Sequence, residues 1–115
     1  MSIYSGRALG GAAGLVAITN ADTTIANPGA STTFDVYEWY VHDRSGNATT
    51  IEFFLSSDAT SAAGERVRYI SVGANETKVI DGLTVPAGYY LIGKASATDR
   101  LNVTGKYTFR DGGNV

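Results

Sequence analysis

The sequence predicts an all-β protein, an antiparallel β-sandwich of about seven strands with a jelly-roll or immunoglobulin-like arrangement. Apolar and polar residues alternate through residues 100–110, and turn-forming residues lie on both sides of a short apolar step at 81–88. No segment carries a sustained helical period. A period of two is typical of a strand that buries one face and exposes the other to water.

The last predicted strand, at 100–110, has the clearest pattern. Its apolar face is formed by Leu101, Val103, Tyr107 and Phe109, and Gly105 occupies the position on this face between Val103 and Tyr107. Before it, Asp-Gly at 81–82 and Pro-Ala-Gly at 86–88 favour turns, and the apolar run that follows begins the strand at 89–96.

The middle of the chain is a succession of short strands joined by polar turns. Residues 34–42 are rich in aromatic and β-branched side chains, 43–47 have the composition of a hairpin loop, and 49–56 return as a strand. A small-residue loop at 57–64 and a turn at 73–76 separate the remaining segments. The predicted strands are 15–19, 34–42, 49–56, 67–72, 77–80, 89–96 and 100–110, and the structure of 20–33 is left open around an Asn-Pro-Gly turn.

The first part of the chain is predicted to be an extended, glycine-rich arm. Four of residues 5–14 are glycines, which disfavour a helix. We therefore predict that residues 1–19 form the arm and first strand and that 20–115 form the β-sandwich domain. A secretory signal with Arg7 before an apolar stretch at 8–17 is the less favoured alternative, because glycines interrupt that stretch. We expect the arm to add to the sheet of another subunit, and removal of residues 1–14 to leave the fold intact.

Composition excludes several classes of function. With 115 residues the chain is long enough for one domain with its own core. Cysteine is absent, so disulfides and thiolate metal sites are excluded. Nine basic and eleven acidic residues give a net charge of -2 without clusters of like charge, so we expect no nucleic-acid partner. No apolar run approaches the ~20 residues needed to span a bilayer, so we expect no membrane partner.

The sequence carries no pattern typical of a catalytic or metal-binding site, so we predict no enzyme, no metal and no cofactor. His42 is the single histidine, and no second ligand stands at a spacing typical of zinc sites. Asp43 next to it could act as a general base, but the sequence shows no nucleophile for such a pair. The segment 43–47 offers oxygen atoms for calcium, although Asp-x-Ser-Gly-Asn is ordinary turn chemistry. The glycines at 10–14 lack the preceding strand and following helix of a phosphate loop.

The aromatic residues are the ambiguous feature of the sequence. Trp39 and Tyr40 are adjacent on one predicted strand, so they point to opposite faces and at least one faces outward. An exposed aromatic ring can stack on a sugar, anchor a protein interface or simply pack under a loop. These alternatives stay open, as they do for Tyr89 and Tyr90 at the start of another strand.

The segments 73–80, 82–96 and 101–104 resemble small β-sandwich virion proteins of tailed bacteriophages. The shared pattern is a turn and strand, a corner of the form Leu-x-Val-x-Ala-Gly at 83–88, and a strand that ends in Lys-Ala-Ser at 94–96. A looser likeness reaches back over 37–55, so that about two-thirds of the chain is covered. The resemblance implies a structural role as a capsid decoration (cement) protein or as an accessory protein of the head, neck or tail.

From the resemblance and the pattern together we predict a non-enzymatic virion protein that stabilises a phage particle through protein contacts. Its partners are the major capsid protein or other virion proteins, it forms a homo-oligomer, and it is assembled in the bacterial host cytoplasm and located at the particle surface. A carbohydrate-binding module that stacks sugars on Trp39 or on the tyrosine pair is the alternative. The predicted interface residues are Ile3, Tyr4, Arg7, Leu9, Trp39, Tyr40, Tyr89 and Tyr90.

Overall fold

The computed structural model describes residues 7–27, 29 and 32–110, and strands make up most of this part of the chain. Two short 3-10 helices interrupt the strands, η1 (Gly11–Ala13) and η2 (Ser61–Ala63). The all-β prediction is confirmed. The described strands are β1 (Arg7–Ala8), β2 (Val16–Ile18), β3 (Thr23–Ala26), β4 (Thr33–Asp43), β5 (Thr49–Ser56), β6 (Gly64–Val72), β7 (Thr77–Ile80), β8 (Leu83–Val85), β9 (Tyr90–Ala95) and β10 (Leu101–Arg110).

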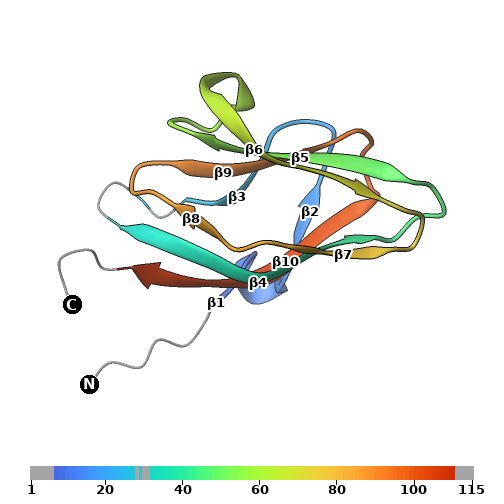
Figure 1. Ribbon diagram of the computed structural model, residues 1–115, viewed down its shortest axis with the longest axis horizontal. Helices are drawn as coiled ribbons and strands as arrows, with labels where there is room; N and C mark the ends of the chain where they lie inside the picture. The colour runs from blue at the N-terminus through green and yellow to red at the C-terminus, as the bar shows by residue number, and fades with distance from the viewer. Residues whose placement is uncertain (1–6, 28, 30–31, 111–115) are drawn as a thin grey trace.

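The strands form two antiparallel sheets that lie one above the other (Figure 1). In the first sheet the order is β1, β10, β4, β7, with β2 also paired to β10 and β8 also paired to β4. In the second sheet the order is β3, β9, β5, β6. The predicted antiparallel sandwich is therefore confirmed.

The number of strands is higher than the predicted seven. Each predicted strand is present, and those at 49–56 and 77–80 have the predicted bounds. The additional strands are β1, β3 and β8, which are two to four residues long. Strands this short contain too few residues for a period of two to be recognised in the sequence. They are strands because β1 pairs with β10, β3 with β9 and β8 with β4.

The segment that follows Arg7 belongs to this chain's own domain. In β1, Arg7 lies opposite Tyr107 of β10, and the Leu9 amide donates a hydrogen bond to the Gly105 carbonyl at 2.9 Å. The side chain of Leu9 is 1% exposed and is part of the core. The expectation that residues 1–14 can be removed without harm to the fold is therefore wrong, because the truncation would take Leu9 out of the core. Residues 1–6, with the predicted interface residues Ile3 and Tyr4, lie outside the described residues.

A β-bulge in β4 decides which aromatic residue enters the core. Tyr37 lies opposite Lys106 and Tyr40 lies opposite Thr104, so β4 carries one extra residue against β10 at this point. Glu38 has a φ of 47°, a left-handed conformation that is uncommon for a residue with a side chain. The bulge shifts the inward positions from 34 and 36 to 39 and 41, which brings Trp39 into the core. The prediction that Trp39 and Tyr40 point to opposite faces is confirmed.

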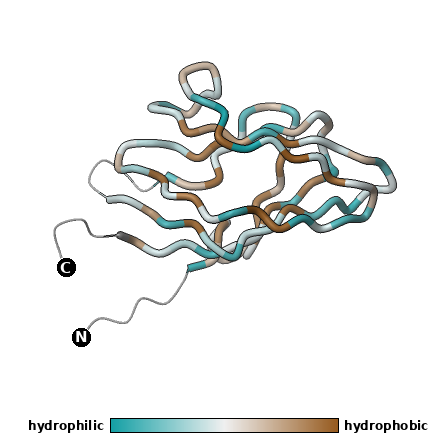
Figure 2. The backbone as a smooth tube through the Cα atoms, in the orientation of Figure 1, coloured by the Kyte–Doolittle hydropathy of each residue, from teal (hydrophilic) through white to brown (hydrophobic). Residues whose placement is uncertain are grey.

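Trp39 is at the centre of the core between the sheets. Its ring meets Phe53 of the second sheet edge-on, with 4.9 Å between the ring centroids, and its Nε1 donates a hydrogen bond to the Asp81 carbonyl at 2.7 Å. Gly105 on β10 leaves room for it, since a Cβ added there would lie 2.3 Å from the Trp39 Cβ. Hydrophobic residues accordingly lie along strands of both layers (Figure 2).

The loop that carries η2 covers part of the outer face of the second sheet. The Ser61 amide donates a hydrogen bond to Asp22 Oδ2 at 2.9 Å, which joins this loop to the residue before β3. Since β9 lies between β5 and β3, a loop that leaves β5 and reaches Asp22 must cross β9. Ile92 of β9 is 0% exposed but is not part of the cluster between the sheets.

Candidate functional site

The second sheet ends in an edge that is longer than the other edges of the fold. Within the described residues β6 pairs with β5 on one side and with no strand on the other. It has nine residues, whereas the edge strands β3 and β7 have four residues each. An edge of this length presents a row of backbone donors and acceptors that another chain can pair with.

The middle of β6 restricts which chains can pair with it. Phe53 lies opposite Arg68 while Phe54 lies opposite Arg66, so Val67 is an extra, bulged residue. The Arg68 guanidinium turns toward the other sheet and donates hydrogen bonds to the Gly82 carbonyl at 3.0 Å and to the Val67 carbonyl at 2.9 Å. A bulge and an inward-pointing charge are two ways in which sheet edges avoid indiscriminate pairing. A partner strand must therefore match an interrupted edge.

A groove of 400 Å³ lies beside the first half of β6, between the ends of the two sheets. Tyr89, 41% exposed, forms part of one wall of this groove. The turn before β9 positions this tyrosine: its amide donates to the Pro86 carbonyl at 3.1 Å, and Gly88 takes a φ of 81°. The groove is lined by Leu55, Ser57, Ala63, Gly64, Glu65, Val67, Pro86 and Tyr89.

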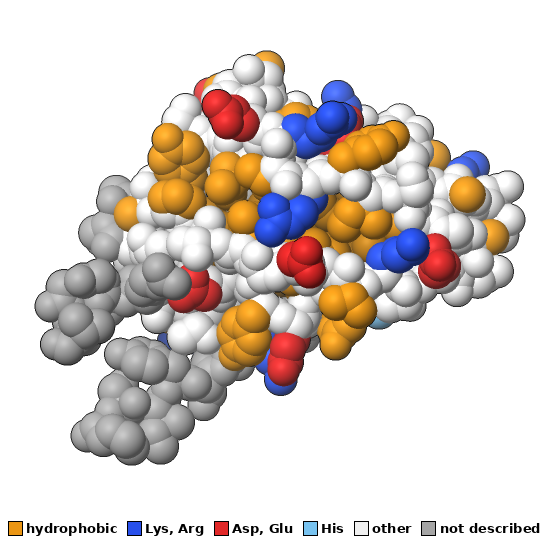
Figure 3. Space-filling model, in the orientation of Figure 1, with side chains coloured by type: hydrophobic (Ala, Val, Ile, Leu, Met, Phe, Trp, Pro, Cys, Tyr) orange, Lys and Arg blue, Asp and Glu red, His pale blue; other side chains and the backbone are white. Residues whose placement is uncertain are grey.

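Charged and hydrophobic side chains alternate over the face that carries β6 (Figure 3). Tyr69 of β6 is 56% exposed and has the Arg66 guanidinium 4.9 Å above its ring. Arg66 also forms an ion pair of 2.9 Å with Glu52. Tyr69 and Val79, the latter 71% exposed on β7, are not among the interface residues predicted from the sequence. The alternation within 67–72 and 77–80 could have indicated them, because one face of an edge strand is open to water.

The structure divides the predicted interface residues between the core and the surface. Leu9 and Trp39 are buried in the core, so neither side chain is available to a partner or to a sugar in this fold, and the proposed stacking role of Trp39 is wrong. Arg7 is exposed, with its guanidinium 4.8 Å from the Phe109 ring centre. Tyr40 and Tyr90 are half-buried on different sheets, and Tyr89 lies in the groove. These residues therefore do not form one contiguous interface.

His42 and Asp43 do not form a catalytic pair. They are neighbours on β4 and point to opposite sides of the first sheet. The ring nitrogens of His42 lie 2.9 Å from the hydroxyls of Thr77 and Thr104, one on each side, which fixes the ring. Asp43 is 4% exposed, and its Oδ1 accepts hydrogen bonds of 2.7 Å from the Ser45 amide and hydroxyl. Both residues thus hold the sheet and the loop at 44–48 in place.

The oxygen atoms of this loop, for which calcium binding was the less favoured alternative, act in turns. Asp43 Oδ1 and the Ser45 hydroxyl, which donates to the Asn47 carbonyl at 3.0 Å, bond to the loop's own backbone. The second oxygen, Asp43 Oδ2, is buried and has no hydrogen-bond partner within the described part of the chain. The described residues contain no group of three or more His, Cys, Asp or Glu side chains placed to hold a metal ion. In the same part of the chain, no helix has the length and apolar character needed to cross a membrane.

Comparison with known proteins identifies no family. No protein-family model matches the sequence, and no curated protein matches it. Among solved structures the chain is similar to a pentameric capsid protein isolated from metagenomic phage sequences, with a TM-score of 0.44 and 14% sequence identity. The match covers 89% of this chain and 64% of that protein, so the chain spans less than two thirds of its length. At this TM-score and identity the likeness assigns no function to the chain.

Proposed function

We propose that this chain is a non-enzymatic structural protein of a phage particle, where it acts as a capsid decoration protein. The observation that supports a binding role is the nine-residue edge of β6, which has no partner strand among the described residues and lies beside a groove that Tyr89 helps to line. The sequence resemblance of 73–104 to virion proteins of tailed bacteriophages supplies the biological setting. A stable scaffold with an open edge is what attachment to a larger assembly requires.

The contact is proposed to form by strand addition. An extended segment of the major capsid protein pairs with the free side of β6, so that backbone hydrogen bonds supply affinity. An apolar side chain of the same segment enters the groove next to Tyr89, and this contact supplies selectivity together with the bulge at Val67. Self-association of the chain stays a separate prediction, which sedimentation of the purified protein tests.

The experiment compares particles with and without the protein. Virions of the encoding phage are purified, the chain is measured in them by mass spectrometry, and particles that lack the gene are incubated with added purified protein. We expect the added protein to bind and to raise the temperature at which the particles release DNA. We expect Tyr89→Ser to weaken binding about tenfold, which corresponds to ~1.4 kcal/mol.

The matched control is Val79→Ser, which removes an exposed hydrophobic side chain from β7, outside the groove. It should bind particles as tightly as the unaltered chain. Absence of the chain from purified virions would overturn the proposed function. Presence in a copy number far below that of the major capsid protein would replace the decoration role by one at the neck or tail, and equal binding of both variants would exclude the groove as the contact.

A further inference from the structure

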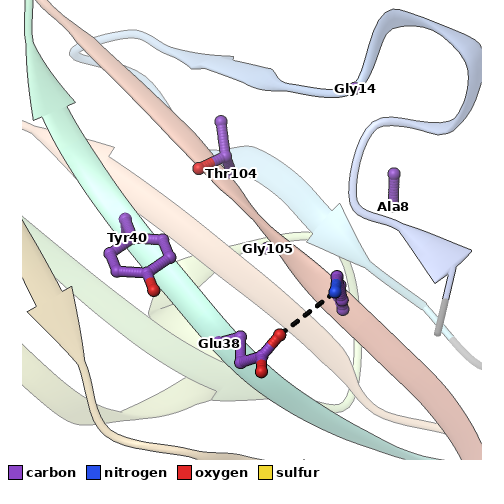
Figure 4. A pocket seen from close by; sticks show the side chains of 7 residues that line it. Ala8, Gly14, Glu38, Tyr40, Thr104 and Gly105 are labelled. Carbon is purple, nitrogen blue, oxygen red and sulfur yellow. Dashed lines mark ion pairs between the residues drawn. The ribbon is translucent and has the colours of Figure 1, made fainter.

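The outer face of the first sheet has a hollow of 430 Å³ on the far side of the sheet from the core (Figure 4). Side chains of β4 and β10 form one part of it, and the segment that contains Ala8 and Gly14 forms another. Its size falls in the lower part of the range of about 300–1,000 Å³ that small-molecule sites occupy. The lining residues are Ala8, Gly14, Glu38, Tyr40, Thr104, Gly105 and Lys106.

The bulge of β4 assembles the polar groups of this hollow. Because Glu38 is the extra residue, it interrupts the alternation after Tyr37 and projects outward, and its carboxylate reaches Lys106 Nζ at 3.1 Å. The Glu38 side chain is 60% exposed and that of Lys106 is 54% exposed, so both remain accessible to a ligand. Glu38 holds this position with a left-handed backbone, and strained backbone of this kind occurs often at binding sites.

The remaining groups add a ring and a hydroxyl. Tyr40 is half-buried, with its ring beside the hollow, and the Thr104 hydroxyl on the neighbouring strand is held by His42 Nε2 at 2.9 Å. Gly105 has no side chain, and its backbone lies between Thr104 and Lys106. The hollow therefore combines one aromatic ring with an acceptor, a donor and a hydroxyl within a short distance.

The charges of the hollow favour a neutral ligand. The hydrogen bond and the charge of Glu38 raise the pKa of Lys106, so this lysine is protonated and paired at neutral pH. The sum of the two charges is zero, which gives no net attraction to a phosphate or to another anion. A ligand with one apolar face and several hydroxyl groups matches the aromatic ring and the mixed donors and acceptors.

We propose that this hollow binds one sugar unit of a neutral oligosaccharide, with the ring stacked on Tyr40 and its hydroxyl groups bonded to Glu38, Lys106 and Thr104. The site binds the sugar without cleaving it. Glycoside hydrolysis uses two carboxyl groups on either side of the bond, whereas among the described residues Glu38 is the one carboxylate that lines the hollow. The inference does not depend on the proposed contact at β6, which is on the other sheet.

The test is an NMR titration of the isotope-labelled full-length chain with cellohexaose, chitohexaose and mannohexaose, each raised to millimolar concentration. We expect at least one of them to shift the amide signals of residues 38–40 and 104–106. Shifts with none of the three sugars, or shifts confined to other residues, overturn the proposal.

Three variants are then titrated with the sugar that binds best. Tyr40→Ala should weaken binding about tenfold or more, and Lys106→Met, which removes the charge but keeps the length of an exposed side chain, should weaken it severalfold. Tyr69→Ala, which removes an exposed tyrosine of the other sheet, should leave binding unchanged. Each variant is checked for a native amide spectrum. If Tyr40→Ala does not retain one, Lys106→Met alone decides, and unchanged binding of that variant rejects the site.

Discussion

Replacement of Gly105 by alanine tests whether this glycine is required for the position of Trp39 in the core. The glycine lies on β10 directly against the bulge of β4, and it has an ordinary strand conformation. A Cβ at this position would lie 2.3 Å from the Trp39 Cβ, 2.8 Å from its Cα and 3.2 Å from Leu9 Cδ1. The two nearest atoms cannot rotate away, because they belong to the backbone and the first side-chain carbon. The strands must therefore separate to accept the methyl group.

The expected cost follows from the usual effect of overpacking. Insertion of one methyl group into a filled core costs about 1–3 kcal/mol, and the lack of a movable neighbour places Gly105→Ala at about 2–3 kcal/mol. For a domain of this size 1 kcal/mol corresponds to about 4 °C in Tm, so we expect a decrease of about 8–12 °C. Total stabilities of about 5–15 kcal/mol leave the variant folded at room temperature.

Thermal unfolding followed by the fluorescence of Trp39, the single tryptophan of the chain, measures this change. The matched control is Gly46→Ala, because a Cβ at Gly46 has no atom within 4 Å and the residue does not have a positive φ. That variant should be as stable as the unaltered protein or about 0.4–1 kcal/mol more stable. An unchanged Tm of Gly105→Ala, or an equal decrease in both variants, would refute the close contact between β10 and Trp39.

Three further changes test other parts of the structure. Leu9→Ala should lower the free energy of unfolding by about 2–5 kcal/mol in urea denaturation, because it leaves a cavity in the core. Trp39→Phe should cost about 1–3 kcal/mol in the same assay, since it removes ring volume and the hydrogen bond to the Asp81 carbonyl. Hydrogen bonds from Ser61 lower the pKa of Asp22 below 3.8, so its carboxylate adds stability that is present above this pH and is lost as the pH falls through the lowered pKa. Asp22→Ala should therefore be less stable than the unaltered chain at neutral pH, and the difference should disappear in strong acid.

Each of these expectations has a result that contradicts it. A change of less than about 1 kcal/mol for Leu9→Ala would place that side chain outside the core. An unaltered denaturation midpoint for Trp39→Phe would mean that the indole nitrogen has no buried partner. For Asp22→Ala, a stability difference that does not vary with pH would mean that the carboxylate charge does not hold the loop, and hydrogen exchange at 57–63 would show whether the loop still covers β9.

Residue pattern alone predicted the class of the fold and most of its strands. The alternation in 49–56 and 100–110 is local and needs no knowledge of the partner strand, because an inward residue is apolar wherever the strand lies. The glycine at 105 was recognised as a member of the apolar face, but its contact with Trp39 depends on a strand about seventy residues earlier in the chain. The sequence also indicated that Trp39 and Tyr40 point to opposite faces, without indicating which one faces inward.

Tertiary structure decided the remaining features. Whether Trp39 or Tyr40 enters the core depends on one extra residue at Glu38, and a bulge exists only in relation to the paired strand β10. The glycine-rich segment after Arg7 has no local strand signal and folds onto β10 because Leu9 gains a place in the core. The open edge of β6 and the hollow between β4 and β10 are likewise set by the order of strands in the sheets. Local alternation specifies strands and their faces, whereas neighbours, edges and hollows arise from pairing between residues that are distant in the sequence.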